Sequence, residues 1–184
     1  MIESKKKRML SPEQIDVALA EIATLAAEQG VEAALIGGVA LALYGSDRFT
    51  SDVDFVAAEA LDALPEEQPL SFGGYLSRTP SGVPVDWVIR NDAADFVALY
   101  KEALAKAAKM PDVPVRVVTP EYLAAMKLVA GRGKDDVDLD MMITEGMVDI
   151  EAAQKIIERL LGAYAAKDFA SRVAVAQWQK GRER

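Results

Sequence analysis

Hydrophobic and polar positions recur with different periods along the chain, and each period predicts a type of element. Between residues 12 and 29, apolar side chains recur every three or four positions, which predicts a helix with one apolar face. Ser11 and Pro12 are start signals for this helix, and Gly30 is a stop signal. Short apolar or alternating runs predict strands at 33–36, 51–57, 70–77, 83–90 and 113–118.

Further helices are expected between and after these strands. One short helix is predicted at 39–44, and a longer one at 92–108 with Asp92 as its N-cap. From residue 119 onward the pattern is helical, over 120–130, 134–145, 149–162 and 165–180. The sequence therefore predicts an α/β (α+β) fold, in which a mixed sheet flanked by helices is followed by a C-terminal helical bundle. The expected domains are residues 1–118 and 119–184.

Composition narrows the chemistry that such a fold can carry. The 184 residues include no histidine and no cysteine, which excludes histidine bases, histidine or cysteine zinc ligands and thiol chemistry. Acid–base or metal chemistry must therefore use carboxylates, lysines and tyrosines, and oxygen ligands favour Mg²⁺ or Mn²⁺. No apolar run approaches the roughly 18 residues of a membrane-spanning helix, and the basic start has no apolar segment of a secretory signal behind it. We expect a cytoplasmic protein with no membrane partner.

The segment from residue 35 to 55 is the most informative part of the chain. Gly37 and Gly38 end an apolar strand, and such a pair lets backbone amides approach a phosphate closely. Asp52 and Asp54 lie in the next predicted strand, where alternation turns both to one face. Two neighbouring carboxylates repel each other unless a cation neutralises them. The alternatives are a tight turn without a ligand and a solvated strand edge; Ser51 either orients a carboxylate or simply ends the loop.

A third acid strengthens the metal interpretation. Asp86 lies on the strand predicted at 83–90, on the face opposite to the apolar side chains. If this strand neighbours the one at 51–57, then Asp52, Asp54 and Asp86 converge, and a divalent-metal pair would suit them. The third carboxylate would then be able to take a proton from an attacking hydroxyl. The alternative is that Asp86 is an ordinary exposed strand acid.

The spacing of these residues resembles a known signature. Gly-Gly, about a dozen residues, Asp-Val-Asp and then a strand Asp is similar to the nucleotidyltransferase superfamily that includes DNA polymerase beta. The wider run from Gly37 to Asp54 resembles, more narrowly, the AbiEii-like toxins of bacterial toxin–antitoxin pairs, and it is also similar to the small-molecule nucleotidyltransferases that inactivate antibiotics. A second block, over 119–128 and 131–139, supports this resemblance with a helical lysine and a Lys-Asp-x-x-Asp segment.

The resemblance implies a metal-dependent enzyme that moves a nucleoside monophosphate from a nucleoside triphosphate to a hydroxyl and releases pyrophosphate. Gly37 and Gly38 would hold the phosphates. Asp52 and Asp54 would bind Mg²⁺ or Mn²⁺, and Asp86 would complete a metal site and activate the acceptor. The further nucleotide-binding candidates are Arg48, Ser51, Lys127, Arg132, Lys134 and Asp138. For the last two residues, a plain surface ion pair is the alternative.

The acceptor is left open by the sequence. An RNA end, with an antitoxin protein as partner, follows from the toxin resemblance. A small molecule such as an antibiotic, or a protein hydroxyl, fits the net charge of −8, because proteins that grip long nucleic acids usually have a basic surface. Basic residues gather mainly at the two ends, at 5–8 and 180–184. A module of the same fold that binds a nucleotide or a partner without turnover is the remaining alternative.

Overall fold

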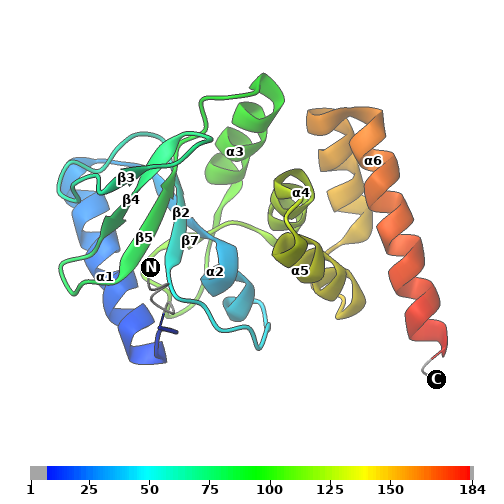
Figure 1. Cartoon of the computed structure of the whole chain (residues 1–184), viewed down its shortest axis with the longest axis horizontal. Helices are drawn as coiled ribbons and strands as arrows, with labels where there is room; N and C mark the ends of the chain where they lie inside the picture. The colour runs from blue at the N-terminus through cyan, green and yellow to red at the C-terminus, as the bar shows by residue number, and fades with distance from the viewer. Residues whose placement is uncertain (1–7, 183–184) are drawn as a thin grey trace, which may run out of the picture. The chain divides into compact units, whose positions relative to one another are not determined.

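The computed structural model describes residues 8–182, which fold into two compact units (Figure 1). The first unit comprises the residues up to Ile89 together with Lys109–Val117, and the second comprises Arg90–Ala108 together with the residues from Val118 onward. The helix within 90–108 is therefore grouped with the C-terminal helices. The basic residues 5–7 and 184 lie outside the described residues.

The first unit begins with helix α1 (Pro12–Gln29), whose ends match the sequence signals. Ser11 and Gln14 form a capping box, in which each side chain satisfies a backbone amide of the other residue. Gly30 ends the helix in the left-handed conformation, at φ 69°. The predicted start and stop of this helix are both confirmed.

The sheet of the first unit has seven strands in the order β3-β4-β5-β2-β1-β7-β6. β1 pairs antiparallel with β2, whereas β2 pairs parallel with β5, so the sheet is mixed as predicted. Its strands are β1 (Ala33–Ile36), β2 (Val53–Ala57), β3 (Gln68–Pro69), β4 (Gly74–Arg78), β5 (Pro84–Val88), β6 (Ala108–Lys109) and β7 (Arg116–Val117).

One face of the two central strands forms the aromatic core of this unit. Phe55 of β2 and Trp87 of β5 are fully buried, and their ring centroids lie 5.3 Å apart. The indole Nε1 of Trp87 donates a 2.9 Å hydrogen bond to the hydroxyl of Ser77, so its one polar group is satisfied. This packing fixes β2 beside β5, and alternation then turns the residues next to Phe55 and Trp87 toward the opposite face.

The second unit is helical. It contains α3 (Ala94–Lys106), α4 (Pro120–Ala130), α5 (Gly133–Thr144) and α6 (Ile150–Arg182), which is interrupted by non-helical backbone at Gly162. The N-cap predicted at Asp92 is wrong. α3 starts after Ala93 without a side-chain cap, because the carboxylate of Asp92 instead accepts two hydrogen bonds from the guanidinium of Arg90.

Glu102 links three helices of this unit. Its carboxylate on α3 accepts hydrogen bonds from the hydroxyl of Tyr122 on α4 and from the guanidinium of Arg159 on α6. The hydrogen bonds from Arg159 and Tyr122 lower the pKa of Glu102 to about 2. Across residues 8–182, no helix combines the length and apolar character that a membrane span requires.

Candidate active site

The turn at Gly37 brings the end of β1 against an aspartate of β2. Helix α2 (Gly37–Leu43) follows β1 without an intervening loop, and Gly37 has a φ of 68°, which side chains with a Cβ rarely adopt. A Cβ at Gly37 would lie 2.6 Å from Cγ of Asp54 and 2.8 Å from its Cβ. Only glycine therefore allows the carboxylate of Asp54 to lie directly on the backbone of this turn.

Thr50 contacts both the second glycine and the first aspartate of the motif. A Cβ at Gly38 would lie 3.2 Å from both Cβ and Oγ1 of Thr50, so the threonine packs closely over this backbone. Its hydroxyl lies 3.1 Å from Oδ1 of Asp52 and 2.9 Å from the carbonyl oxygen of the same residue. Thr50 thus connects the glycine turn to the Asp52 carboxylate.

Asp54 and Asp86 occupy paired positions on neighbouring parallel strands. The register aligns Asp54 of β2 with Asp86 of β5, and Val53 and Phe55 with Val85 and Trp87. The sequence interpretation depended on these two strands being neighbours, and the structure meets that condition. Asp52 differs from the expectation in one respect, because β2 begins at Val53 and Asp52 stands just before the strand, where Thr50 accounts for its placement.

Donor type and position decide whether these carboxylates suit a metal ion. Asp52, Asp54 and Asp86 offer only oxygen donors, as Mg²⁺ and Mn²⁺ prefer. Within the described range, 8–182, no three acidic side chains are already grouped as a metal-binding cluster. The donor chemistry and the paired strand positions therefore fit such a cation, although not as a preformed site of three carboxylates.

Arg48 and Ser51 lie on the same connection, between α2 and β2. The backbone amide of Arg48 donates to the hydroxyl of Ser46 at 3.3 Å, and the backbone carbonyl of Thr50 accepts from Leu10 at 2.8 Å. Both Arg48 and Ser51 are half-buried. The structure thus places both residues on the connection that carries Thr50 and Asp52, and their roles in nucleotide binding stay predictions.

The other candidates form a separate cluster in the second unit. The ammonium of Lys127 on α4 donates to Asp135 at 2.8 Å and to Asp138 at 2.7 Å, both on α5, and all three residues are buried. Burial opposes ionisation of Asp135, but hydrogen bonds from Arg132 and Lys127 outweigh it and lower the pKa of this carboxyl. The ammonium of Lys127 thus forms ion pairs with two carboxylates of its own unit.

Arg132 and Lys134 flank the start of α5. Gly131 ends α4 in the left-handed conformation and Arg132 is the N-cap of α5, so the predicted break between the two helices is confirmed. Arg132 pairs with Asp135 while its side chain remains 58% exposed. Lys134 is exposed on the first turn of α5. Both are accessible cations, and phosphate binding by them stays a prediction.

Sequence reasoning missed two residues that organise these clusters. Thr50 connects Gly38 to Asp52, and no spacing rule identifies a hydroxyl that acts from an irregular loop. Asp135 shares Lys127 with Asp138, and a signal for it was present: the two aspartates are three residues apart, which places them on one face of a helix.

The tight approach at Gly37 leads to a stability prediction. We expect Gly37→Ala to lower the free energy of unfolding clearly more than Gly30→Ala does. The two glycines have φ values of 68° and 69°, but a Cβ at Gly30 meets nothing within 4 Å. Gly30→Ala should thus cost only the left-handed strain of about 1–2 kcal/mol, and Gly37→Ala should add about 1–3 kcal/mol for the collision with Asp54. Denaturant unfolding of both variants measures the difference, and equal losses would contradict this geometry.

The Lys127 cluster leads to a second stability prediction. Lys127→Met should lower the free energy of unfolding at pH 7 by about 3 kcal/mol, because it removes the cation shared by two buried carboxylates. The pKa of Asp135 is below its unfolded value of 3.8, so this stabilisation is present above pH 3.8 and disappears as the pH falls further. Denaturant unfolding at pH 7 and at lower pH measures both effects.

Lys155→Met is the matched control for that variant. Lys155 pairs with Glu151 on α6, but both side chains are more than 70% exposed, and such a solvent-exposed pair contributes little to stability. A similar small loss in Lys127→Met would show that the buried cluster does not stabilise the second unit.

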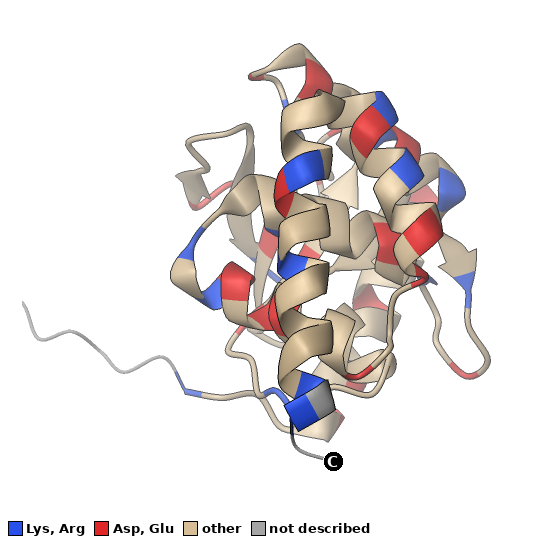
Figure 2. Cartoon of the chain, turned by 90° about the vertical axis from the view of Figure 1, so that its right-hand side faces the viewer, with Lys and Arg blue, Asp and Glu red and all other residues tan. Residues whose placement is uncertain are grey.

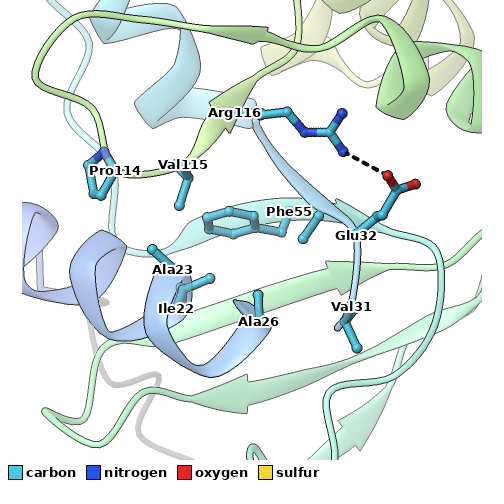
Figure 3. Close-up of a pocket in the computed structure, with 10 residues that line it drawn as sticks. Ile22, Ala23, Ala26, Val31, Glu32, Phe55, Pro114, Val115 and Arg116 are labelled. Carbon is cyan, nitrogen blue, oxygen red and sulfur yellow. Dashed lines mark ion pairs between the residues drawn. The ribbon is translucent and has the colours of Figure 1, made fainter. Parts of the chain in front are cut away.

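The first unit also contains a pocket of about 300 Å³ that is distinct from these residues (Figure 3). Ile22 of α1 and Phe55 of β2 line it, and an ion pair of 3.7 Å joins Arg116 to Glu32 at its edge. Phe55 follows Asp54 in the strand, so its ring points to the other face of the sheet. The pocket therefore does not belong to the carboxylate site.

The mixed sheet, the glycine turn and the paired strand aspartates together define a nucleotidyltransferase fold. Residues 13–184 match the model of a family described as "Nucleotidyltransferase of unknown function (DUF6036)", and the chain therefore belongs to this family and to the nucleotidyltransferase superfamily. No curated protein matches the chain.

Solved structures are similar at the level of the fold. An antigenic nucleotidyltransferase-like protein from Paracoccidioides brasiliensis is 17% identical and has a TM-score of 0.50, with 91% of this chain and 95% of that chain covered. The antibiotic-resistance factor ANT(2'')-Ia is 14% identical with a TM-score of 0.47, and 94% of this chain and 99% of that chain are covered. The first of these two similarities supports the fold predicted from the sequence.

Proposed function

We propose that this chain is an active, metal-dependent nucleotidyltransferase that transfers a nucleoside monophosphate from a nucleoside triphosphate to a hydroxyl group. The observation that carries the proposal is the position of Asp54. Its carboxylate lies on the backbone of Gly37, and its register partner on the neighbouring strand is Asp86. The glycine turn and two strand carboxylates thus meet near the start of β2. Family membership supports the reaction class.

Each residue of this group has a role in the proposed reaction. Asp52, Asp54 and Asp86 would hold Mg²⁺ or Mn²⁺, which would offset the charge of the triphosphate when bound. The backbone at Gly37 and Gly38 would orient the phosphates, and Thr50 would keep the Asp52 carboxylate in place.

The proposed transfer balances without a further reactant. The acceptor oxygen forms a bond to the α-phosphorus, and the bond from that phosphorus to the bridging oxygen of the β-phosphate breaks. Pyrophosphate leaves, and Asp86 accepts the proton of the acceptor hydroxyl. Positioning and charge neutralisation would supply most of the rate enhancement, as in phosphoryl transfer generally.

The candidates outside this group have narrower proposed roles. Arg48 and Ser51 would brace the loop or contact a phosphate. In the second unit, Arg132 and Lys134 are exposed cations that would meet phosphates, and Asp138 would position Lys127 through the contact described above. Because two carboxylates already hold Lys127, we propose that it contacts the triphosphate only if this pairing loosens.

The acceptor is proposed to be an RNA end, engaged through few contacts. Acidic and basic residues are interspersed along α6, with basic residues at its last turn (Figure 2). Such a surface offers few phosphate contacts, so RNA binding should depend only weakly on salt concentration. An RNA acceptor would fit a toxin that is paired with an antitoxin protein. A small molecule or a protein hydroxyl is the alternative that the net charge of −8 favours.

Acceptor identification tests this proposal. The protein with Mg²⁺ and α-labelled nucleoside triphosphates is incubated with total cellular RNA, and separately with a lysate from which RNA has been removed. Label in RNA supports the toxin-like reaction. Label only in small molecules or proteins would shift the acceptor to the alternative. If nucleotide binds but neither fraction is labelled, the chain is a binding module without turnover.

A further inference from the structure

Phe49 presents an aromatic ring to solvent beside the candidate active site. It is 77% exposed and lies on the connection between α2 and β2, directly before Thr50. The backbone on both sides of it is held, by the bond from the Arg48 amide to Ser46 and by the bond from the Leu10 amide to the Thr50 carbonyl. The backbone from which the ring extends is therefore fixed by hydrogen bonds on both sides.

The neighbours of Phe49 connect it to the glycine turn. Thr50 packs against Gly38 and binds the carboxylate of Asp52, so Phe49 directly precedes the residue that contacts the groups assigned to the phosphates and the metal. In a nucleoside triphosphate, the base is joined to the α-phosphate through the ribose. An exposed ring on the connection that also carries Thr50 and Asp52 could therefore meet the part of the nucleotide beyond its phosphates.

We propose that Phe49 stacks against the base of the donor nucleotide; this inference rests on the proposed function. An exposed phenyl ring has no polar group that reads the edge of a base, but it offers a flat apolar face to any base. The stacking interaction becomes stronger as the area of overlap between the two rings increases. Because a purine base is larger than a pyrimidine base, purine triphosphates should bind more tightly than pyrimidine triphosphates. Phe49 would therefore set a preference for purines without discriminating strictly between them.

Binding measurements on three variants test the stacking role. Mg²⁺ complexes of ATP, CTP and inorganic tripolyphosphate are titrated calorimetrically into the wild type, Phe49→Ala, Phe49→Leu and Phe49→Trp. We expect Phe49→Ala to weaken ATP binding by about 10-fold, within the range measured for base–aromatic stacking. Phe49→Leu should behave similarly, Phe49→Trp should restore or tighten binding, and tripolyphosphate affinity should stay unchanged in all three.

Tyr164→Ala is the matched control, because Tyr164 is an even more exposed aromatic residue, at 89%, on α6. It should leave every affinity unchanged. If Phe49→Ala binds ATP as the wild type does, the stacking role is wrong while the proposed function stands. An equal loss of ATP and tripolyphosphate affinity would make Phe49 a structural loop residue and would also overturn the inference. If the wild type binds neither compound, the proposed function itself fails.

Discussion

Replacing both Asp52 and Asp54 by asparagine is expected to abolish Mg²⁺-dependent nucleotide binding and to reduce transfer by about 10³-fold or more. Both side chains keep their size but lose the charge that would offset a divalent cation. Because the Asp54 carboxylate lies on the Gly37 backbone, the substitution removes its negative charge at the place where the phosphates would lie. Calorimetric titration of ATP with and without Mg²⁺, together with a transfer assay, measures both effects.

Asp47→Asn is the matched control for this double variant. Asp47 is exposed and lies on the same connection, so the substitution changes the local charge without touching the site. It should leave binding and transfer unchanged. If the double variant binds nucleotide with undiminished Mg²⁺ dependence, these two residues are not the metal ligands.

Asp86→Asn is expected to separate binding from turnover. Loss of a general base commonly reduces the rate by about 10²- to 10⁴-fold, so we expect kcat to fall by about 10²-fold or more. Nucleotide affinity should change only a few-fold, because Asp52 and Asp54 would still bind the cation. Steady-state kinetics and calorimetry on the same preparation give the two quantities.

Thermal unfolding without metal provides the check on folding for this variant. Asp86 and Asp54 occupy paired strand positions, so removing one negative charge should leave the melting temperature unchanged or raise it. A variant that melts much earlier would identify Asp86 as a structural residue. Unchanged turnover in a well-folded variant would contradict its proposed role as the base.

Local patterns in the sequence predicted the elements around the site, but not every contact within it. The period of two in strands β2 and β5 placed Asp54 and Asp86 opposite the apolar face, and the capping signals located α1. The sequence left open whether β2 and β5 are neighbours, because pairing between strands so far apart in the chain is a tertiary property. The buried contact between Phe55 and Trp87 packs the two strands together.

Loop and cluster contacts were harder to predict for a related reason. Thr50 acts from an irregular segment, where no periodicity relates a side chain to its partners. Lys127 was assigned to the triphosphate through the resemblance, whereas the structure pairs it with Asp135 and Asp138 on the next helix. The spacing of those two aspartates on one helix face could be read from the sequence. Which residue they share could not, because that depends on how α4 packs against α5.

The most direct test of the nucleotidyltransferase assignment follows two labels in one reaction. The wild-type protein is incubated with Mg²⁺ and a nucleoside triphosphate labelled at either the α- or the γ-phosphate, in a cell extract that contains the acceptor. We predict that the α label becomes attached to an acceptor while the γ label appears in pyrophosphate, and that Asp52→Asn combined with Asp54→Asn removes both signals. Transfer of the γ label to an acceptor, or its release as inorganic phosphate with no α label transferred, would contradict the assignment.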